Sequence, residues 1–252
     1  MTTTNNLPPI VSRDEWTAAR RALLTAEKEA VRAKDALNTR RRELPIVRIE
    51  KQYTFDGPDG PRTLAELFGG RRQLIVQHFM FHPDWADGCG SCTAALDEVN
   101  DGLLRHLAAR ETSYAVIARA PLAKLQAYRA KRGWSIPLHS SFGSDFNYDF
   151  HVTIDASVTP VEFNYRTADE LRAAGQDWLL DPAGMPMEQP GMSCFLRVGD
   201  EVFHTYSTFA RGTEQTGGSY GFLDMTALGR QEDWEEPKGR SGASRGAVPN
   251  FD

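Results

Sequence analysis

The sequence predicts an α/β protein built on an open, mostly parallel sheet, and two kinds of segment carry that prediction. Residues 73–81 (QLIVQHFMF) and 113–119 (SYAVIAR) are nearly continuous apolar runs, which is typical of strands buried on both faces. Each run is followed by a segment with helical periodicity, over 92–110 and 121–133. The order strand, helix, strand, helix indicates right-handed crossovers between parallel strands.

Residues 12–43 form the longest helical pattern in the chain. Ser12 and Glu15 form a capping box, and Pro45 ends the pattern. Apolar side chains recur every seven residues along it, and charged residues fill the other faces; one seam consists of Trp16, Leu23, Ala30 and Leu37. We expect a homodimer through this helix, although packing of the helix along its own domain fits the pattern equally well.

Shorter elements precede and follow the central part. A Gly/Pro turn occupies residues 57–61, and Thr63 caps a brief helix that ends at Gly69. Two alternating runs within 193–208 indicate a β-hairpin, and a final helix is expected over about 214–228. The sequence therefore predicts a helical arm, a folded domain and a mobile tail, over 1–45, 46–233 and 234–252.

Composition limits the classes of function. The 252-residue chain has a net charge of −5, which argues against a nucleic-acid partner because such partners normally require a basic face. No apolar run approaches the about 20 residues that span a bilayer, so no membrane partner is expected. The first residues, MTTTNNLPPI, lack the pattern of a secretory signal, and we expect a cytoplasmic protein.

Two of the three cysteines, Cys89 and Cys92, are spaced Cys-x-x-Cys directly before a helical pattern. In a reducing compartment this spacing indicates redox chemistry or metal binding rather than a structural disulfide. A cysteine at a helix N-terminus favours the thiolate, which predicts Cys89 as the nucleophile. Cys92 returns to the same face about one turn later, where it can resolve a mixed disulfide without any cofactor.

Other side chains are candidates for supporting roles or for a substrate pocket. Trp85 is placed to cover one side of the dithiol, and Asp84 is either a proton acceptor or a solvated loop residue. Tyr148 belongs to an aromatic loop, FGSDFNYDF, whose aromatics either anchor the loop to the core or line a pocket. Tyr206 and Arg211, in HTYSTFARG, are possible polar contacts near a site.

Several separated segments resemble an uncharacterised bacterial thioredoxin-like family, the domain of unknown function 899: VSRDEWTAARRALLTAEKEAVRAKDAL, QLIVQHFMFHPDWADGCGSC, APLAKLQAY, GSDFNYDF and EVFHTYSTFARG. The resemblance spans about residues 11–230. It implies a thioredoxin-like fold of three layers with a central mixed sheet, and it supplies almost no function. The partner would be a thiol or disulfide substrate, either a protein or a small molecule.

The chain departs from two thioredoxin-like patterns. Thioredoxin-type enzymes place a cis-proline before the hairpin strand, whereas the approximate equivalent here is Met192 or Ser193, with Pro190 upstream. Peroxiredoxins need Pro, then Thr or Ser, then Cys at fixed spacing, and counting from Pro83 reaches Asp87 and Gly90. The peroxiredoxin pattern is therefore absent.

Two alternatives to redox chemistry stay open. Thioredoxin-like copper chaperones use two cysteines and a later histidine, so Cys89, Cys92 and His204 would form a copper or zinc site. His204 is the candidate because it belongs to the predicted hairpin, which such folds place beside the cysteine loop. The other alternative is a non-catalytic dimeric binding protein that uses the aromatic loop.

Overall fold

The computed structural model describes residues 8–216, 218 and 223–226, and the chain divides into two compact units with a boundary after Pro45. The first unit contains helix α1 (Arg13–Arg42). The predicted capping box is confirmed: Glu15 N donates to Ser12 Oγ at 3.2 Å, and Glu15 Oε2 accepts from Ser12 N at 2.8 Å. No residue within α1 is buried.

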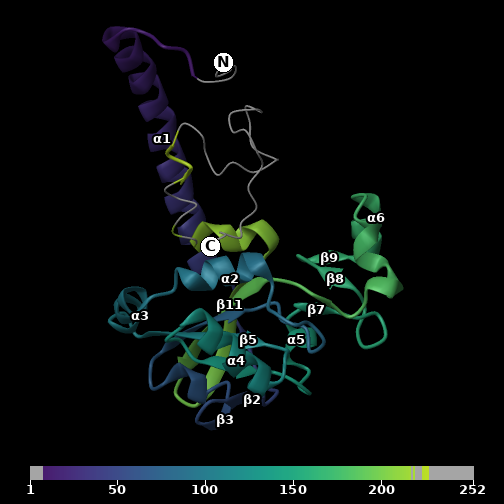
Figure 1. Cartoon of the computed structure of the whole chain (residues 1–252). Helices are drawn as coiled ribbons and strands as arrows, with labels where there is room; N and C mark the ends of the chain where they lie inside the picture. Colours follow the sequence, from purple (N-terminus) through teal and green to yellow (C-terminus); the bar gives the residue numbers. More distant parts are fainter. Residues whose placement is uncertain (1–7, 217, 219–222, 227–252) are drawn as a thin grey trace. The chain divides into compact units, whose positions relative to one another are not determined.

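The second unit is built on an eight-stranded mixed sheet in the order β1–β12–β11–β4–β5–β6–β2–β3 (Figure 1). The central strands β4, β5 and β6 are parallel, and the β11–β12 hairpin pairs antiparallel with β4. This is the thioredoxin-like arrangement that the resemblance implies. The strands are β1 (Val47–Arg48), β2 (Thr54–Gly57), β3 (Gly60–Thr63), β4 (Gln73–His78), β5 (Thr112–Ala118), β6 (Leu138–Ser140), β11 (Gly191–Val198) and β12 (Glu201–Phe209).

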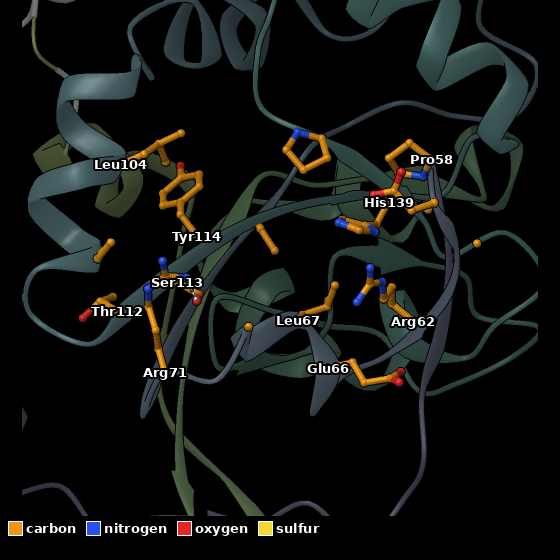
Figure 2. Close-up of a pocket in the computed structure, with 17 residues that line it drawn as sticks. Pro58, Arg62, Glu66, Leu67, Arg71, Leu104, Thr112, Ser113, Tyr114 and His139 are labelled. Atoms are coloured by element: carbon orange, nitrogen blue, oxygen red, sulfur yellow. Dashed lines mark hydrogen bonds between the residues drawn. The ribbon is translucent and has the colours of Figure 1, made fainter.

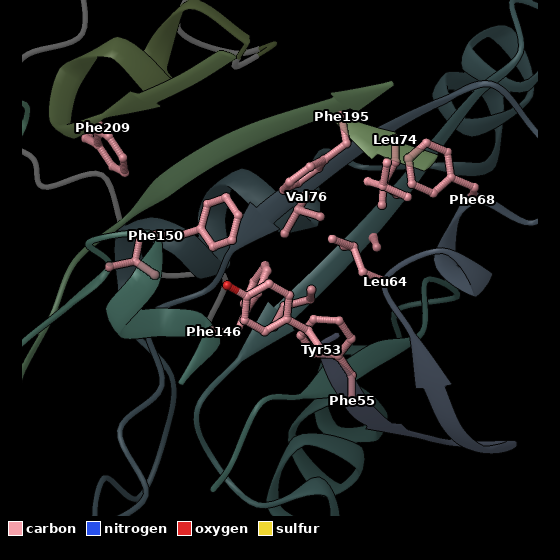
Figure 3. Close-up of a cluster of buried hydrophobic side chains, with 14 residues drawn as sticks. Tyr53, Phe55, Leu64, Phe68, Leu74, Val76, Phe146, Phe150, Phe195 and Phe209 are labelled. Carbon is pink, nitrogen blue, oxygen red and sulfur yellow. The ribbon is translucent and has the colours of Figure 1, made fainter. Parts of the chain in front are cut away.

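The two faces of the sheet bury separate cores. Leu74 and Val76 of β4 point into the first core, which the short helices η1 (Glu66–Phe68) and α5 (Phe146–Asp149) also line (Figure 3). Phe79, just past β4, lies in the second core, where it meets side chains of α2 (Gly90–Asp97) and α4 (Leu122–Arg132). Because successive side chains of a strand point to opposite faces, β4 is buried on both sides.

The prediction of one continuous helix over 92–110 is wrong. The structure contains α2 and a separate helix α3 (Asp101–Ala108). Asn100 separates them because its side chain accepts a hydrogen bond from Leu103 N at 3.1 Å and so caps α3. An Asn side chain competes with the helical backbone, so it favours a helix start over a helix interior.

A third, smaller core belongs to the segment between β6 and β11. A final 3-10 helix, η4 (Ala210–Thr216), replaces the start of the helix predicted over 214–228, and most of that range and the tail 234–252 lie outside the described residues. In the described part of the chain, no helix is both long and apolar enough to cross a membrane. The remaining elements are β7 (Thr153–Ile154), β8 (Glu162–Phe163), β9 (Arg166–Thr167), α6 (Ala168–Ala173), η2 (Asp177–Leu180), η3 (Pro182–Gly184) and β10 (Met187–Glu188).

A chain of four polar side chains crosses the first core. His78 Nε2 and Ser193 Oγ are 2.8 Å apart, Ser193 Oγ and Ser207 Oγ 2.7 Å, and Ser207 Oγ and His204 Nε2 2.7 Å. His78 is 2 % exposed, and its ring is within stacking distance of Phe146. Burial, followed by the charge of His204, lowers the pKa of His78 to about 3, so the imidazole is neutral in the folded protein.

The neutral state of His78 makes stability depend on pH. Below about pH 6.5 the unfolded chain binds a proton at this imidazole that the folded chain does not bind, so its contribution is present above that pH and is lost as the pH falls toward 3. Between pH 7.5 and pH 5.5, we expect the free energy of unfolding to fall by about 1.4 kcal/mol more in the wild type than in His78→Gln. Urea unfolding at both pH values measures this difference.

The control is His106→Gln, which removes an exposed histidine of α3 and leaves the slope unchanged. Equal slopes for the wild type and His78→Gln would contradict the assignment.

Candidate functional site

Cys89 and Cys92 meet at the start of α2, beyond the carboxyl end of β4. Cys89 is the N-cap residue of α2, which begins at Gly90. Cys92 is buried in the second core at 6 % exposed, whereas Cys89 is half-buried, and both thiols are free. Chemistry in open α/β sheets gathers at the carboxyl ends of strands, so the dithiol occupies the edge where an active site is expected.

The two thiols have opposite acid strengths. A hydrogen bond from the Cys92 thiol, helped by the N–H groups of Cys92 and Ser91 and opposed by burial, lowers the pKa of Cys89 to about 6. The same hydrogen bond and burial raise the pKa of Cys92 well above its usual range. At neutral pH the pair therefore holds one thiolate, on the more exposed sulfur, and one thiol that donates to it.

Short backbone contacts fix the position of Cys89. Its N–H donates to Met80 O at 2.9 Å, and its carbonyl accepts from both N and Oγ1 of Thr93 at 2.9 Å. Thr93 Oγ1 is also 2.8 Å from the hydroxyl of Tyr128 in α4. A Cβ at position 88 would lie 2.3 Å from Phe79 Cζ, so the residue before the nucleophile must be glycine.

Two lysines of α4 hold the loop that precedes the dithiol. Lys124 Nζ donates to the carbonyl oxygens of Pro83 and, at 2.7 Å, of Trp85. Lys131 Nζ forms an ion pair with Asp87 at 2.9 Å. Neither lysine is predicted from the sequence, since a contact between residues about 40 positions apart leaves no local signal.

The two candidates from this loop lie near the dithiol in sequence but are mainly solvated. The side chain of Asp84 is 89 % exposed, and its carboxylate is 3.7 Å from His82 Nδ1. The ring of Trp85 is 38 % exposed and lies beside His82, at 6.0 Å between centroids. Trp85 remains the candidate for covering the site, whereas the solvated interpretation of Asp84 fits its exposure.

The aromatic loop anchors itself to the first core, which lies on the other face of the sheet. Phe146 and Phe150 are buried in this core. Tyr148, which lies between them in the sequence, belongs to α5 and is half-buried. Asp149 accepts from the Tyr53 hydroxyl at 2.7 Å and from Lys51 Nζ at 2.7 Å. The short helix α5, which carries Tyr148, is thus anchored to the first core, whereas Cys92 lies in the second.

Tyr206 and Arg211 lie on and after the hairpin. Tyr206 of β12 is paired in register with Cys194 of β11, and this third cysteine is half-buried. Arg211 Nε is 3.1 Å from Glu214 Oε1 within η4. Pro190 directly precedes β11, and Ser193 points into the first core; the cis peptide bond in the described residues joins Met185 to Pro186.

His204 is not assembled with the dithiol. The pairing of β11 with β12 shifts by one residue between Cys194 and Phe195, and this bulge brings His204 and Ser207 to the same face. That face packs against Phe150 and Phe195 in the first core, whereas Cys92 lies in the second. Within the described residues no three His, Cys, Asp or Glu side chains are grouped to hold a metal ion.

The family model described as "Bacterial protein of unknown function (DUF899)" matches residues 5–245 of the chain. No curated protein matches the chain. Similar solved structures include a cysteine-to-serine variant of PrxQ from Xylella fastidiosa, with 12% identity, a TM-score of 0.40, and coverage of 65% of this chain and 84% of that chain.

Peroxidoxin BcpB from Mycobacterium tuberculosis is 13% identical at a TM-score of 0.43, with coverage of 68% of this chain and 91% of that chain. A putative protein disulfide isomerase from Bacteroides thetaiotaomicron is 21% identical at a TM-score of 0.32, with coverage of 56% of this chain and 97% of that chain.

The lowered pKa of Cys89 predicts a reactive thiolate at mildly acidic pH. The rate of its alkylation by iodoacetamide should rise with pH through a midpoint of about 6, against about 8.5 for an ordinary cysteine. In Cys92→Ala the midpoint should move upward, because the thiol that donates to Cys89 is gone. Mass spectrometry of the labelled peptide measures both curves.

Cys194→Ser is the matched control, since it removes the cysteine of β11 and leaves the dithiol intact. A wild-type midpoint near that of an ordinary cysteine would contradict the electrostatic assignment.

Proposed function

The chain belongs to the bacterial family of unknown function DUF899, and for this member we propose a thiol–disulfide oxidoreductase that uses the Cys89–Cys92 dithiol. One observation carries the proposal: a half-buried Cys89 at the N-terminus of α2 is stabilised as a thiolate by the buried thiol of Cys92. A nucleophile and a resolving group within hydrogen-bonding reach are what two-step disulfide exchange needs.

In the first step, the Cys89 thiolate attacks one sulfur of a substrate disulfide. A bond forms between Cys89 Sγ and that sulfur, the substrate S–S bond breaks, and the other sulfur leaves as a thiolate that takes a proton from water. The N–H groups of Ser91 and Cys92 stabilise the Cys89 thiolate before the attack. The half-buried position of Cys89 leaves its sulfur accessible to a partner.

In the second step, Cys92 attacks Cys89 Sγ. Once Cys89 is in a mixed disulfide, its negative charge no longer raises the pKa of Cys92, so the Cys92 proton is released more easily to the departing substrate sulfur. A Cys89–Cys92 disulfide forms, and the second substrate sulfur leaves as a thiol. The substrate gains two electrons and two protons, and an external dithiol returns the protein to its reduced state.

The proposed partner is a thiol or disulfide of a protein or a small molecule, in the cytoplasm, with no nucleic acid and no membrane involved. The chemistry needs no bound cofactor, because both electrons come from the dithiol. The exposed Trp85 and the loop that Lys124 holds border the nucleophile in sequence, and we propose them as part of the docking surface.

The roles of the two cysteines predict different defects. With a disulfide substrate and dithiothreitol as the reductant, Cys89→Ser should lower turnover at least 100-fold, since the nucleophile is lost. Cys92→Ser should form a stable mixed disulfide through Cys89, because nothing resolves it. Turnover assays and intact-protein mass spectrometry measure these outcomes.

Cys194→Ser serves as the control and should retain turnover. Wild-type turnover in Cys89→Ser, or trapping through Cys92 in place of Cys89, would refute the proposed mechanism.

We also propose that α1 forms a homodimer with a second copy of the chain. The support is its heptad seam, including Trp16, Leu23 and Leu37, whose side chains are exposed on a helix with no buried residue. Sedimentation should give a dimer for the full chain and a monomer after removal of residues 1–45. A full chain that is monomeric, or a truncated chain that stays dimeric, would contradict this role of α1.

A further inference from the structure

A cavity of about 320 Å³ lies at the end of the sheet opposite the dithiol (Figure 2). It is bordered by the β2–β3 hairpin, η1, α3 and the start of β5. Thr112 at the start of β5 pairs with Gln73 at the start of the parallel β4, whereas Cys89 follows the end of β4. The cavity is therefore a separate site, and its role does not depend on the redox proposal.

Two arginines line this cavity at different ends. Arg71 Nη1 donates to Ser113 Oγ at 3.2 Å, and Arg62 lies on the other side, beside His139 (Figure 2). Neither guanidinium has a carboxylate within ion-pair distance among the residues that the structure describes. The carboxylate of Glu66, which also lines the cavity, is occupied by the N–H and hydroxyl of Thr63 at 2.7 and 2.9 Å.

His139 supplies an independent polar group at the Arg62 end. It is 7 % exposed, and in the described part of the chain its Nδ1 is buried without a hydrogen-bond partner. A Cβ at Gly57 would lie 2.8 Å from this nitrogen, so only glycine at that position leaves the ring its space. Burial, then the charge of Arg62, lowers the pKa of His139 against the opposing effect of Asp59, so the ring is neutral at pH 7.

An unpartnered buried nitrogen is costly unless a ligand or water satisfies it. A guanidinium and an imidazole N–H beside each other offer the donors that an oxyanion accepts. The rest of the wall includes apolar side chains, among them Leu67 of η1 and Leu104 of α3. The wall is mixed, because Thr112, Ser113 and Tyr114 line it as well. A concave site with apolar side chains and a few polar groups that fix orientation is typical of sites that bind small organic molecules.

We propose that this cavity binds a small organic anion, with its oxyanion held by Arg62 and His139 and its apolar body against Leu67 and Leu104. Arg71, at the other end, binds a second acceptor group of a longer ligand.

Phenyl phosphate is the probe, since it joins an oxyanion to an apolar ring. It should bind with a saturable calorimetric signal and shift the NMR resonances of the His139 ring. Arg62→Gln should weaken binding about tenfold, because one charge-assisted hydrogen bond is lost. Arg72→Gln is the matched control: Arg72 is exposed, pairs with Glu111 at 3.8 Å and does not line the cavity.

Three results would overturn the proposal. They are the absence of a saturable shift at His139, equal affinities for Arg62→Gln and Arg72→Gln, and inorganic phosphate binding as tightly as phenyl phosphate. Thermal unfolding of each variant checks that the fold is intact. Tighter binding of phenyl phosphate than of inorganic phosphate, weakened about tenfold in Arg62→Gln and unchanged in Arg72→Gln, supports the proposal.

Discussion

Burial of β4 on both faces is the constraint on which the rest of the second unit depends. Leu74 and Val76 of β4 enter the first core, whereas Phe79 and Phe81, just past its end, enter the second. Each fully buried apolar side chain contributes about 1.5–3 kcal/mol. A one-residue slip in register would exchange the two sets, so the strand is locked along its length. The carboxyl end of β4 is therefore a fixed point. From it Phe79 packs against Gly88 and Met80 accepts the hydrogen bond of Cys89.

Burial on the two faces of the sheet also controls the protonation of two polar groups, His78 and Cys92. On one face, the buried imidazole of His78, which hydrogen-bonds to Ser193, stays neutral because desolvation disfavours its protonated form. On the other, the buried Cys92 stays protonated and uses that proton to stabilise its neighbour. Burial thus suppresses ionisation in both places. At the partly exposed helix start, Cys89 ionises readily because the Cys92 thiol and the N–H groups of α2 stabilise its charge.

Patterns within one element were visible in the sequence, whereas pairings between distant elements were not. The apolar runs predicted β4 and β5, and Gly133 was expected to end the helix that is α4, where it adopts a left-handed conformation. The break at Asn100 was missed because apolar periodicity continues across it. The assignment of His204 to the dithiol rested on its place in the predicted hairpin, and the bulge that accompanies its position in the first core is not visible in a single strand's pattern.

That bulge has a consequence for how this scaffold could be rebuilt. It makes β12 one residue longer than its partner between Cys194 and Phe195, and Thr205 is the residue left without a partner in the ladder. Removing Thr205 would restore strict alternation and keep every other pairing of the ladder, so His204 and Ser207 would be two positions apart and still on one face. In a regular strand, two residues three positions apart point to opposite faces, so the extra residue is what lets an imidazole and a hydroxyl at this spacing meet in the first core.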